Sequence, residues 1–198
     1  MAEREDCEGD EYLMLDDVLL SLRGKNAESL RQLYSDNSSW FSRAGGSHHN
    51  HQVWCGGYLD HMAEVCNIAR LMYTSLNSKR TLSFSLDDAL EVLLVHDVEK
   101  PWKYQYSGDN LNVLSLSCSS DDWRISMMKK YNIVFSPLQE NALKYVHGEL
   151  DEYSSTIRVA SPLASFVHCC DFLSARVWFD HPFMTGDSWS GCKRNLVE

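Results

Sequence analysis

The chain has 198 residues, of which 44% are apolar and 23% are charged. This length and balance are typical of one globular domain with a buried core. The 10 glycines and 4 prolines exclude collagen-like and low-complexity classes. The formal net charge of −10 argues against a protein that binds duplex nucleic acid through bulk positive charge, since such a surface normally shows a basic excess.

The acidic charge is concentrated at the N-terminus. Residues 1–17 hold eight acidic residues and one basic residue, so their net charge is −7 and the rest of the chain carries −3. This pattern predicts an acidic, solvated N-terminal arm over residues 1–17. An interaction tail is the alternative interpretation of the same segment.

The sequence predicts an intracellular, soluble protein. The acidic N-terminus lacks the basic and apolar stretches of a secretory signal, and no apolar run approaches the ~18–20 residues of a membrane span. The seven cysteines form an odd set without a C-x-x-C pair, which is typical neither of a disulfide framework nor of a zinc ribbon. Reduced thiols favour a cytoplasmic location.

Apolar residues recur at steps of three and four along most of the chain, which predicts helices. The expected helical segments are residues 11–34, 57–76, 86–96, 121–131, 137–147 and 162–179. Ser85, Ser136 and Ser161 are the expected N-cap residues of the segments that follow them. Only residues 111–117 show a weak strand pattern. We therefore expect an all-α helical bundle over residues 18–179, with the acidic arm before it and a loosely structured tail over residues 180–198.

Histidine and aspartate fall at chemically informative positions. His96 and Asp97 are adjacent and follow an apolar run, so both can turn toward one point where the chain leaves a helix. His61 lies in one further helical stretch and Asp171 in another, and each can add a ligand. Imidazole and carboxylate together suit Mn, Fe, Co, Ni, Zn or Mg. Helices that converge on one metal are a common way to build a site inside a bundle.

In this order the four residues resemble the H…HD…D signature of the HD-domain phosphohydrolase superfamily. The resemblance covers about residues 40–178 and is carried by HQVWCGGYLDHMAEV (51–65), LLVHDVEKPWKY (93–104), KYVHGELDEYSS (144–155) and PLASFVHCCDFLSAR (162–176). It implies a single HD-domain helical bundle. It also implies one divalent metal ion, of undetermined identity, with the ligands His61, His96, Asp97 and Asp171.

The same resemblance implies roles for flanking residues. Lys100 would face a substrate phosphate or assist the leaving group, and His51 would contact phosphate or bound water. Arg43, by its place in the sequence shortly before His51, is expected to clamp an anion such as phosphate. Binuclear relatives carry paired histidines near His147, but Val146 breaks the pair here, so a second metal is not expected. His147 would instead donate to a substrate oxygen or act as an acid or base. The expected catalytic residues are Asp97, Lys100 and His147, and the expected substrate-binding residues are Arg43, His51 and Lys100.

These features predict a metal-dependent phosphohydrolase that cleaves a phosphate ester or anhydride of a small nucleotide, a nucleoside mono- or triphosphate, through metal-activated water. Two alternatives stay open. A 3′→5′ exonuclease on single-stranded nucleic acid is one, because HGEL (147–150) and DFLSAR (171–176) resemble segments of such enzymes, although the acidic charge disfavours a long polyanion. A non-catalytic HD scaffold that senses nucleotides is the other. No membrane partner is expected, and a homodimer is left open.

Overall fold

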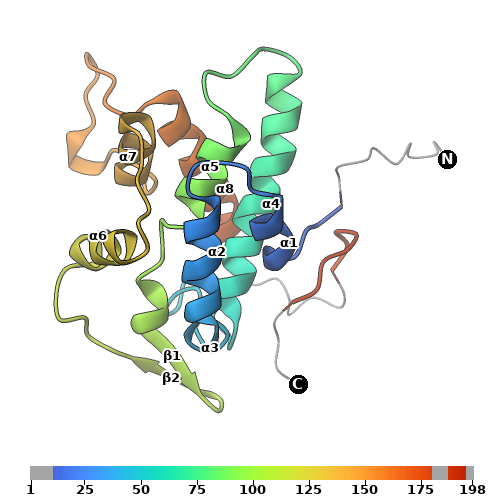
Figure 1. The fold of residues 1–198 in the computed structure, drawn as a ribbon, viewed down its shortest axis with the longest axis vertical. Coiled ribbons are helices and arrows are strands. Elements are labelled where there is room, and N and C mark those ends of the chain that lie inside the picture. The colour runs from blue at the N-terminus through green and yellow to red at the C-terminus, as the bar shows by residue number, and fades with distance from the viewer. Residues whose placement is uncertain (1–10, 180–186, 195–198) are drawn as a thin grey trace.

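The computed structural model describes residues 11–179 and 187–194, and about half of them lie in α-helices (Figure 1). The α-helices of this part are α1 (Leu15–Ser21), α2 (Ala27–Asp36), α3 (Ser38–Phe41), α4 (Gly57–Asn77), α5 (Leu86–Leu93), α6 (Ser120–Lys130), α7 (Pro137–Lys144) and α8 (Pro162–Val177). The strands are β1 (Tyr104–Ser107) and β2 (Asn110–Val113), and the short 3-10 helices are η1 (Lys100–Trp102) and η2 (Leu150–Glu152).

Helix α4 is the centre of the bundle. Its first half, residues 57–69, is buried except for the half-buried Leu59. A helix that is buried all round belongs to the interior of a fold. Helix α4 packs against α8, α5 and α1, and α8 also contacts α5 and α7. The end of α5 and the middle of α8 therefore meet the first turns of α4.

The serine caps predicted from the sequence are confirmed. The Ser85 and Ser136 hydroxyls accept hydrogen bonds from the third backbone N–H of α5 and α7, and both helices carry a complete capping box. Ser161 caps α8 in the same way through the N–H of Ala164. The predicted helix over residues 11–34 is instead two helices, α1 and α2. The turn between them passes close to α5 at Gly24, where an added Cβ would lie 2.3 Å from Oε1 of Glu91.

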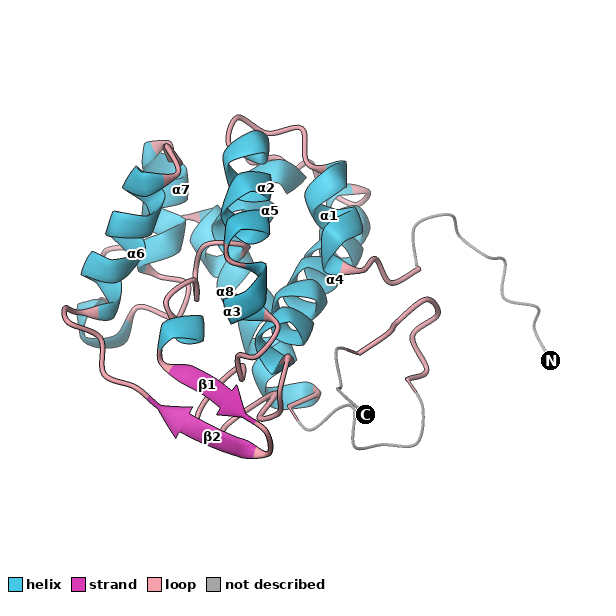
Figure 2. Ribbon diagram, turned by 60° about the horizontal axis from the view of Figure 1, so that its bottom comes forward, coloured by secondary structure: helices cyan, strands magenta, loops and turns pink. Residues whose placement is uncertain are grey.

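The prediction of a strictly all-α fold is wrong, because strands β1 and β2 form an antiparallel hairpin beside the helices (Figure 2). Gly108 in its turn has a φ of 58°, which a tight hairpin favours. The weak strand predicted over residues 111–117 corresponds in part to β2. Its partner β1 was missed because its buried position is polar: the Gln105 side chain donates to the carbonyls of Trp40 (2.9 Å) and Pro101 (2.5 Å). Alternation of apolar residues therefore does not mark this strand.

Both predicted terminal segments are partly structured. Of the predicted arm, residues 1–10 lie outside the described residues, but Tyr12 is only 3% exposed and α1 begins at Leu15. Of the predicted loose tail, residues 187–194 pack against this start, and the backbone N–H of Tyr12 donates to the Ser190 carbonyl (2.8 Å). Composition alone did not indicate this packing at the N-terminus, because acidic residues outnumber the apolar side chains that anchor it.

A buried carboxylate joins three parts of the bundle. Glu91 on α5 is 2% exposed and accepts hydrogen bonds from Asn26, through its backbone N–H (2.8 Å) and Nδ2 (2.7 Å), and from Nε2 of Gln139 (2.9 Å). Asn26 precedes α2, and Gln139 lies on α7. The carboxylate thus fixes the positions of α2 and α7 relative to α5.

We expect the Glu91→Ala variant to lose at least ~2 kcal/mol of unfolding free energy, because each buried donor left unpaired costs about 1–3 kcal/mol. Urea unfolding followed by circular dichroism measures the change. The control is Glu28→Ala, whose side chain is 86% exposed and pairs with Arg31 on the surface. Its effect should stay within about 1 kcal/mol. Equal effects in the two variants would contradict the role assigned to Glu91.

Candidate metal centre

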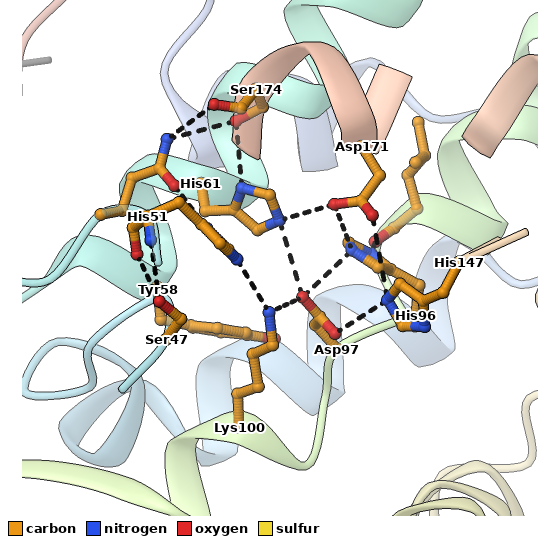
Figure 3. Close-up of polar contacts among 12 residues, drawn as sticks. Ser47, His51, Tyr58, His61, His96, Asp97, Lys100, His147, Asp171 and Ser174 are labelled. Atoms are coloured by element: carbon orange, nitrogen blue, oxygen red, sulfur yellow. Dashed lines mark hydrogen bonds and ion pairs between the residues drawn. The ribbon is translucent and has the colours of Figure 1, made fainter. Parts of the chain in front are cut away.

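Four side chains from three parts of the fold converge on one point (Figure 3). His61 comes from α4, His96 and Asp97 follow the end of α5, and Asp171 comes from α8. One nitrogen or oxygen atom of each lies within 4.8 Å of the corresponding atoms of the others. The His61 and His96 side chains are fully buried, and that of Asp171 is 12% exposed. The residues that the sequence predicts as metal ligands are therefore brought together.

The end of α5 explains how two adjacent residues reach the same centre. Beyond Leu93 the chain continues in tight turns, in which the N–H of Val95 and of His96 both donate to the Val92 carbonyl. A regular helix would separate neighbouring side chains by about 100° around its axis. Arg124 on α6 holds the turn by donating to the His96 carbonyl. His96 and Asp97 can therefore both face inward.

Two glycines determine how α4 begins and where His61 lies. Gly56 has a φ of 82°, in the left-handed region that favours glycine. At Gly57 an added Cβ would lie 2.0 Å from the carbonyl oxygen of Gln52, so only glycine fits against that backbone. This close approach brings His51 and Gln52 against the second turn of α4. The Gly-Gly pair of the sequence motif thus has a steric reason.

Hydrogen bonds orient both histidines with Nε2 toward the centre. Nδ1 of His96 lies 2.6 Å from the Leu93 carbonyl oxygen, which can only accept, so this nitrogen carries a hydrogen. Nδ1 of His61 lies 3.0 Å from the hydroxyl of Ser174. The Nε2 atoms of both rings are buried and have no hydrogen-bond partner among the residues that the structure describes. Such outer contacts are typical of histidines that bind metals.

The separations between donor atoms fit a single small cation. Nε2 of His61 lies 3.2 Å from Oδ1 of Asp171 and 3.6 Å from Oδ2 of Asp97. Nε2 of His96 lies 3.2 Å from Oδ2 of Asp97 and 3.5 Å from Oδ1 of Asp171. Ligands bound at ~2.1 Å lie about 3.0 Å apart at right angles and about 3.4 Å apart at the tetrahedral angle. The cluster could therefore hold a metal ion without large rearrangement.

The electrostatics of the cluster also favour a cation. Burial would lower the pKa of His96, but Asp97 and Asp171 outweigh it and raise that pKa to about 10. Burial would raise the pKa of Asp97, but His96 and Lys100 hold it well below its usual range. The pKa of Asp171 is likewise held low, against burial, by the neighbouring His61 and His96. A divalent ion would supply the positive charge that a proton on His96 otherwise provides.

Lys100 and His51 lie directly beside the cluster. The ammonium group of Lys100 contacts the Asp97 carboxylate and lies 3.4 Å from Nε2 of His51. Burial would lower the pKa of Lys100, but Asp97 outweighs it and raises that pKa, so Lys100 is a cation. Burial, together with the nearby His61 and Lys100, lowers the pKa of His51 to about 3. His51 is therefore neutral, and its Nε2 is an acceptor that faces Lys100.

His147 lies where the cluster is open. Its side chain is 50% exposed, and its Nε2 lies 3.6 Å from Oδ1 of Asp97 and 3.9 Å from Oδ2 of Asp171. A cavity of about 690 Å³ between α6 and α7 extends to His147 and Gly148. A second cavity, of about 740 Å³, borders Gly148 and His168. This side therefore offers room for a small molecule.

The structure does not bring Arg43 to the cluster. Arg43 is exposed, and its Nε donates to the Ser39 carbonyl (3.2 Å). Across residues 11–179 and 187–194 no hydrogen bond or ion pair joins its side chain to the four predicted ligands. Its role as a phosphate clamp stays a prediction.

Two residues of the site were missed in the sequence. Ser174 and Glu64 lie behind His61, and the Ser174 hydroxyl donates to Oε2 of Glu64 (2.8 Å). Ser174 follows Asp171 by three residues and Glu64 follows His61 by three, so each shares a helix face with a predicted ligand. That spacing could have marked both as neighbours of the site.

No protein-family model matches the chain, and no curated protein or solved structure is significantly similar to it. Within the residues that the structure describes, none of the helices is both long and apolar enough to cross a membrane.

We expect the purified chain to bind one equivalent of Mn²⁺ or Co²⁺, and the Asp171→Asn variant to bind it at least ~100-fold more weakly. Loss of a direct ligand should exceed the 10–100-fold typical of outer contacts. Calorimetric titration measures the affinity, and elemental analysis after dialysis measures the stoichiometry. The control is His48→Ala, an exposed histidine outside the cluster. Binding by Asp171→Asn that matches the unmodified chain would contradict this centre.

Proposed function

We propose that the chain is a metal-dependent phosphohydrolase that acts on a small phosphate ester or anhydride of a nucleotide, as the resemblance to the HD-domain superfamily implies. One observation carries the proposal. The four residues of the H…HD…D pattern converge beside a partly buried cation, Lys100, and the cluster opens to solvent at His147. A cation site and a fixed positive charge next to an open cavity suit an anionic substrate.

A divalent cation, when bound, supplies charge that polarises a phosphoryl oxygen and makes a nearby water more acidic. His61, His96, Asp97 and Asp171 would hold that ion, and Asp97 also holds the ammonium group of Lys100. Lys100 places a second positive charge on the same side of the site. Hydrolysis needs such charge because a nucleophile must approach an anion.

His51 supports Lys100 in this proposal. Its neutral ring accepts from the ammonium group through Nε2, while its Nδ1 lies 2.6 Å from Oε1 of Gln52. The side chain of Lys100 is therefore held between the Asp97 carboxylate and the His51 ring. A flexible lysine that is held in this way loses less entropy when it binds a phosphate oxygen. In this proposal His51 positions Lys100.

His147 is the proposed acid or base. It is the most exposed of the site residues, and its Nε2 faces the carboxylates of Asp97 and Asp171 at 3.6 and 3.9 Å. A leaving-group oxygen that sits over the cluster would come within reach of this nitrogen. Proton transfer by a positioned imidazole contributes about 10²–10⁴-fold to the rate of such reactions.

We expect Lys100→Gln to lower kcat for phosphate release by about 10²–10³-fold, the usual cost of removing one group that stabilises developing charge. Metal content should stay at the level of the unmodified chain, because Lys100 is not among the ligands. The control is Lys103→Gln, which removes an amine that lies 3.4 Å from the Ser120 hydroxyl and contacts none of the four predicted ligands in the part of the chain that the structure describes. Equal rates in the two variants would remove Lys100 from the mechanism.

The reaction itself is tested with nucleoside mono-, di- and triphosphates in the presence of Mn, Co, Mg or Zn, with products identified by mass. We expect release of phosphate or a phosphate chain by the unmodified protein. The His96→Ala/Asp97→Ala double variant should show no release while circular dichroism still shows a folded protein. A labelled single-stranded oligonucleotide is tested as a substrate in separate reactions under the same conditions. Undiminished release by the double variant, or stepwise shortening of the oligonucleotide without nucleotide hydrolysis, would contradict the proposal.

A further inference from the structure

A row of buried polar contacts connects His61 to the last described segment of the chain. Nδ1 of His61 lies 3.0 Å from the Ser174 hydroxyl, which donates to Oε2 of Glu64 at 2.8 Å (Figure 3 shows the contact of His61 with Ser174). Oε1 of Glu64 accepts from Arg194 at 2.9 Å. Ser174 is fully buried and the Glu64 side chain is 1% exposed. Four side chains from α4, α8 and residues 187–194 are thus linked.

The direction of these hydrogen bonds determines which nitrogen of His61 faces the cluster. An ionised carboxylate only accepts, so the Ser174 hydroxyl must give its hydrogen to Glu64. The lone pairs of Ser174 then accept the hydrogen on Nδ1 of His61. The remaining nitrogen, Nε2, has a lone pair directed at Asp97 and Asp171. The arrangement therefore prepares His61 to bind a metal.

Arg194 supplies the positive charge on which this arrangement depends. Glu64 also accepts from Nε2 of Gln52 (3.0 Å), but that donor is neutral. Among the described residues, Arg194 is the cation that contacts Glu64. Burial would lower the pKa of Arg194, but the Glu64 carboxylate outweighs this and raises it. A buried carboxylate without a counter-charge is unfavourable, and the Arg194 guanidinium supplies that counter-charge to Glu64.

The position of Arg194 is set by contacts near the N-terminus. Its guanidinium pairs with Asp187 (2.9 Å) and lies over the ring of Tyr12, 5.9 Å from the ring centroid. The same Tyr12 ring makes an edge contact with Trp189 (5.3 Å between centroids).

The backbone of this last segment also packs closely against Tyr12. At Gly191 an added Cβ would lie 2.9 Å from the Tyr12 carbonyl oxygen. Residues 187–194 are therefore anchored where Arg194 can reach Glu64.

We propose that Arg194 is a positioning residue for the candidate metal centre, acting on His61 through Glu64 and Ser174. The proposal rests on the metal binding that the proposed function requires. Its consequence is that residues 187–194, which follow the last predicted ligand and contribute no ligand themselves, influence the affinity of the site for its metal ion.

The first test compares the Mn²⁺ affinity of Arg194→Gln with that of the unmodified full chain, by competition with a chelator. We expect about 10-fold weaker binding, within the 10–100-fold that outer contacts of metal ligands typically contribute. Arg194→Lys retains the charge and should restore most of the affinity. The visible spectrum of bound Co²⁺ should change in Arg194→Gln, because the His61 ring is less firmly oriented. Urea unfolding of the metal-free variants separates these effects from a loss of stability.

A matched control and a double variant make the test specific. Arg70→Gln removes an arginine that contacts the Glu11 carbonyl (3.2 Å) in the same region but does not touch Glu64, and it should leave metal affinity unchanged. Ser174→Ala breaks the link to His61, so adding Arg194→Gln to it should weaken binding little further. Additive effects of the two changes would show that Arg194 acts by another route.

The outcomes distinguish this proposal from the proposed function. Normal metal affinity and an unchanged Co²⁺ spectrum in Arg194→Gln would overturn the role of Arg194, even if the protein hydrolyses nucleotides. Weakened binding that Arg194→Lys restores would support it, even if no nucleotide is hydrolysed. Failure of the unmodified chain to bind any metal ion would overturn both proposals.

Discussion

Two carboxylates and two imidazoles are buried together at the centre of this helix bundle, and the rest of the structure has to compensate for them. Charge at such depth is strongly unfavourable unless it is paired and hydrogen-bonded. Lys100 contacts Asp97, and the histidines lie within 3.2–3.6 Å of both carboxylates. These contacts exist only if α4, α8 and the end of α5 meet at one point. Helix packing and the chemistry of the site are therefore parts of one arrangement.

The two histidines of the cluster are oriented by different means. His96 is held by the carbonyl of Leu93, three residues before it, so its orientation follows from the local turn at the end of α5. His61 is held by Ser174 on another helix and, beyond it, by Glu64. Its orientation therefore depends on the packing of α4 against α8. A substitution remote from the centre can therefore alter the orientation of His61 more readily than that of His96.

The parts of the fold that were predictable are those governed by local rules. Ser85, Ser136 and Ser161 cap helices because a hydroxyl can accept from a backbone N–H three residues later, whatever surrounds it. The hairpin was less predictable because Gln105, a polar residue, fills a buried position by bonding to carbonyls of distant segments. The predicted acidic arm includes structured residues for a similar reason. Composition does not reveal that Tyr12 is buried against residues 187–194.

The sequence by itself determined which residues could form a metal site. The order of His61, the His96–Asp97 pair and Asp171, on separate apolar segments, points to one chemistry because imidazole and carboxylate favour divalent cations. Only the tertiary structure decided that these atoms converge, that His147 lies at the open side, and that Arg43 donates to the Ser39 carbonyl. It also decided that Arg194 reaches Glu64. Contacts between distant segments depend on how whole helices pack, and that packing cannot be predicted from local patterns in the sequence.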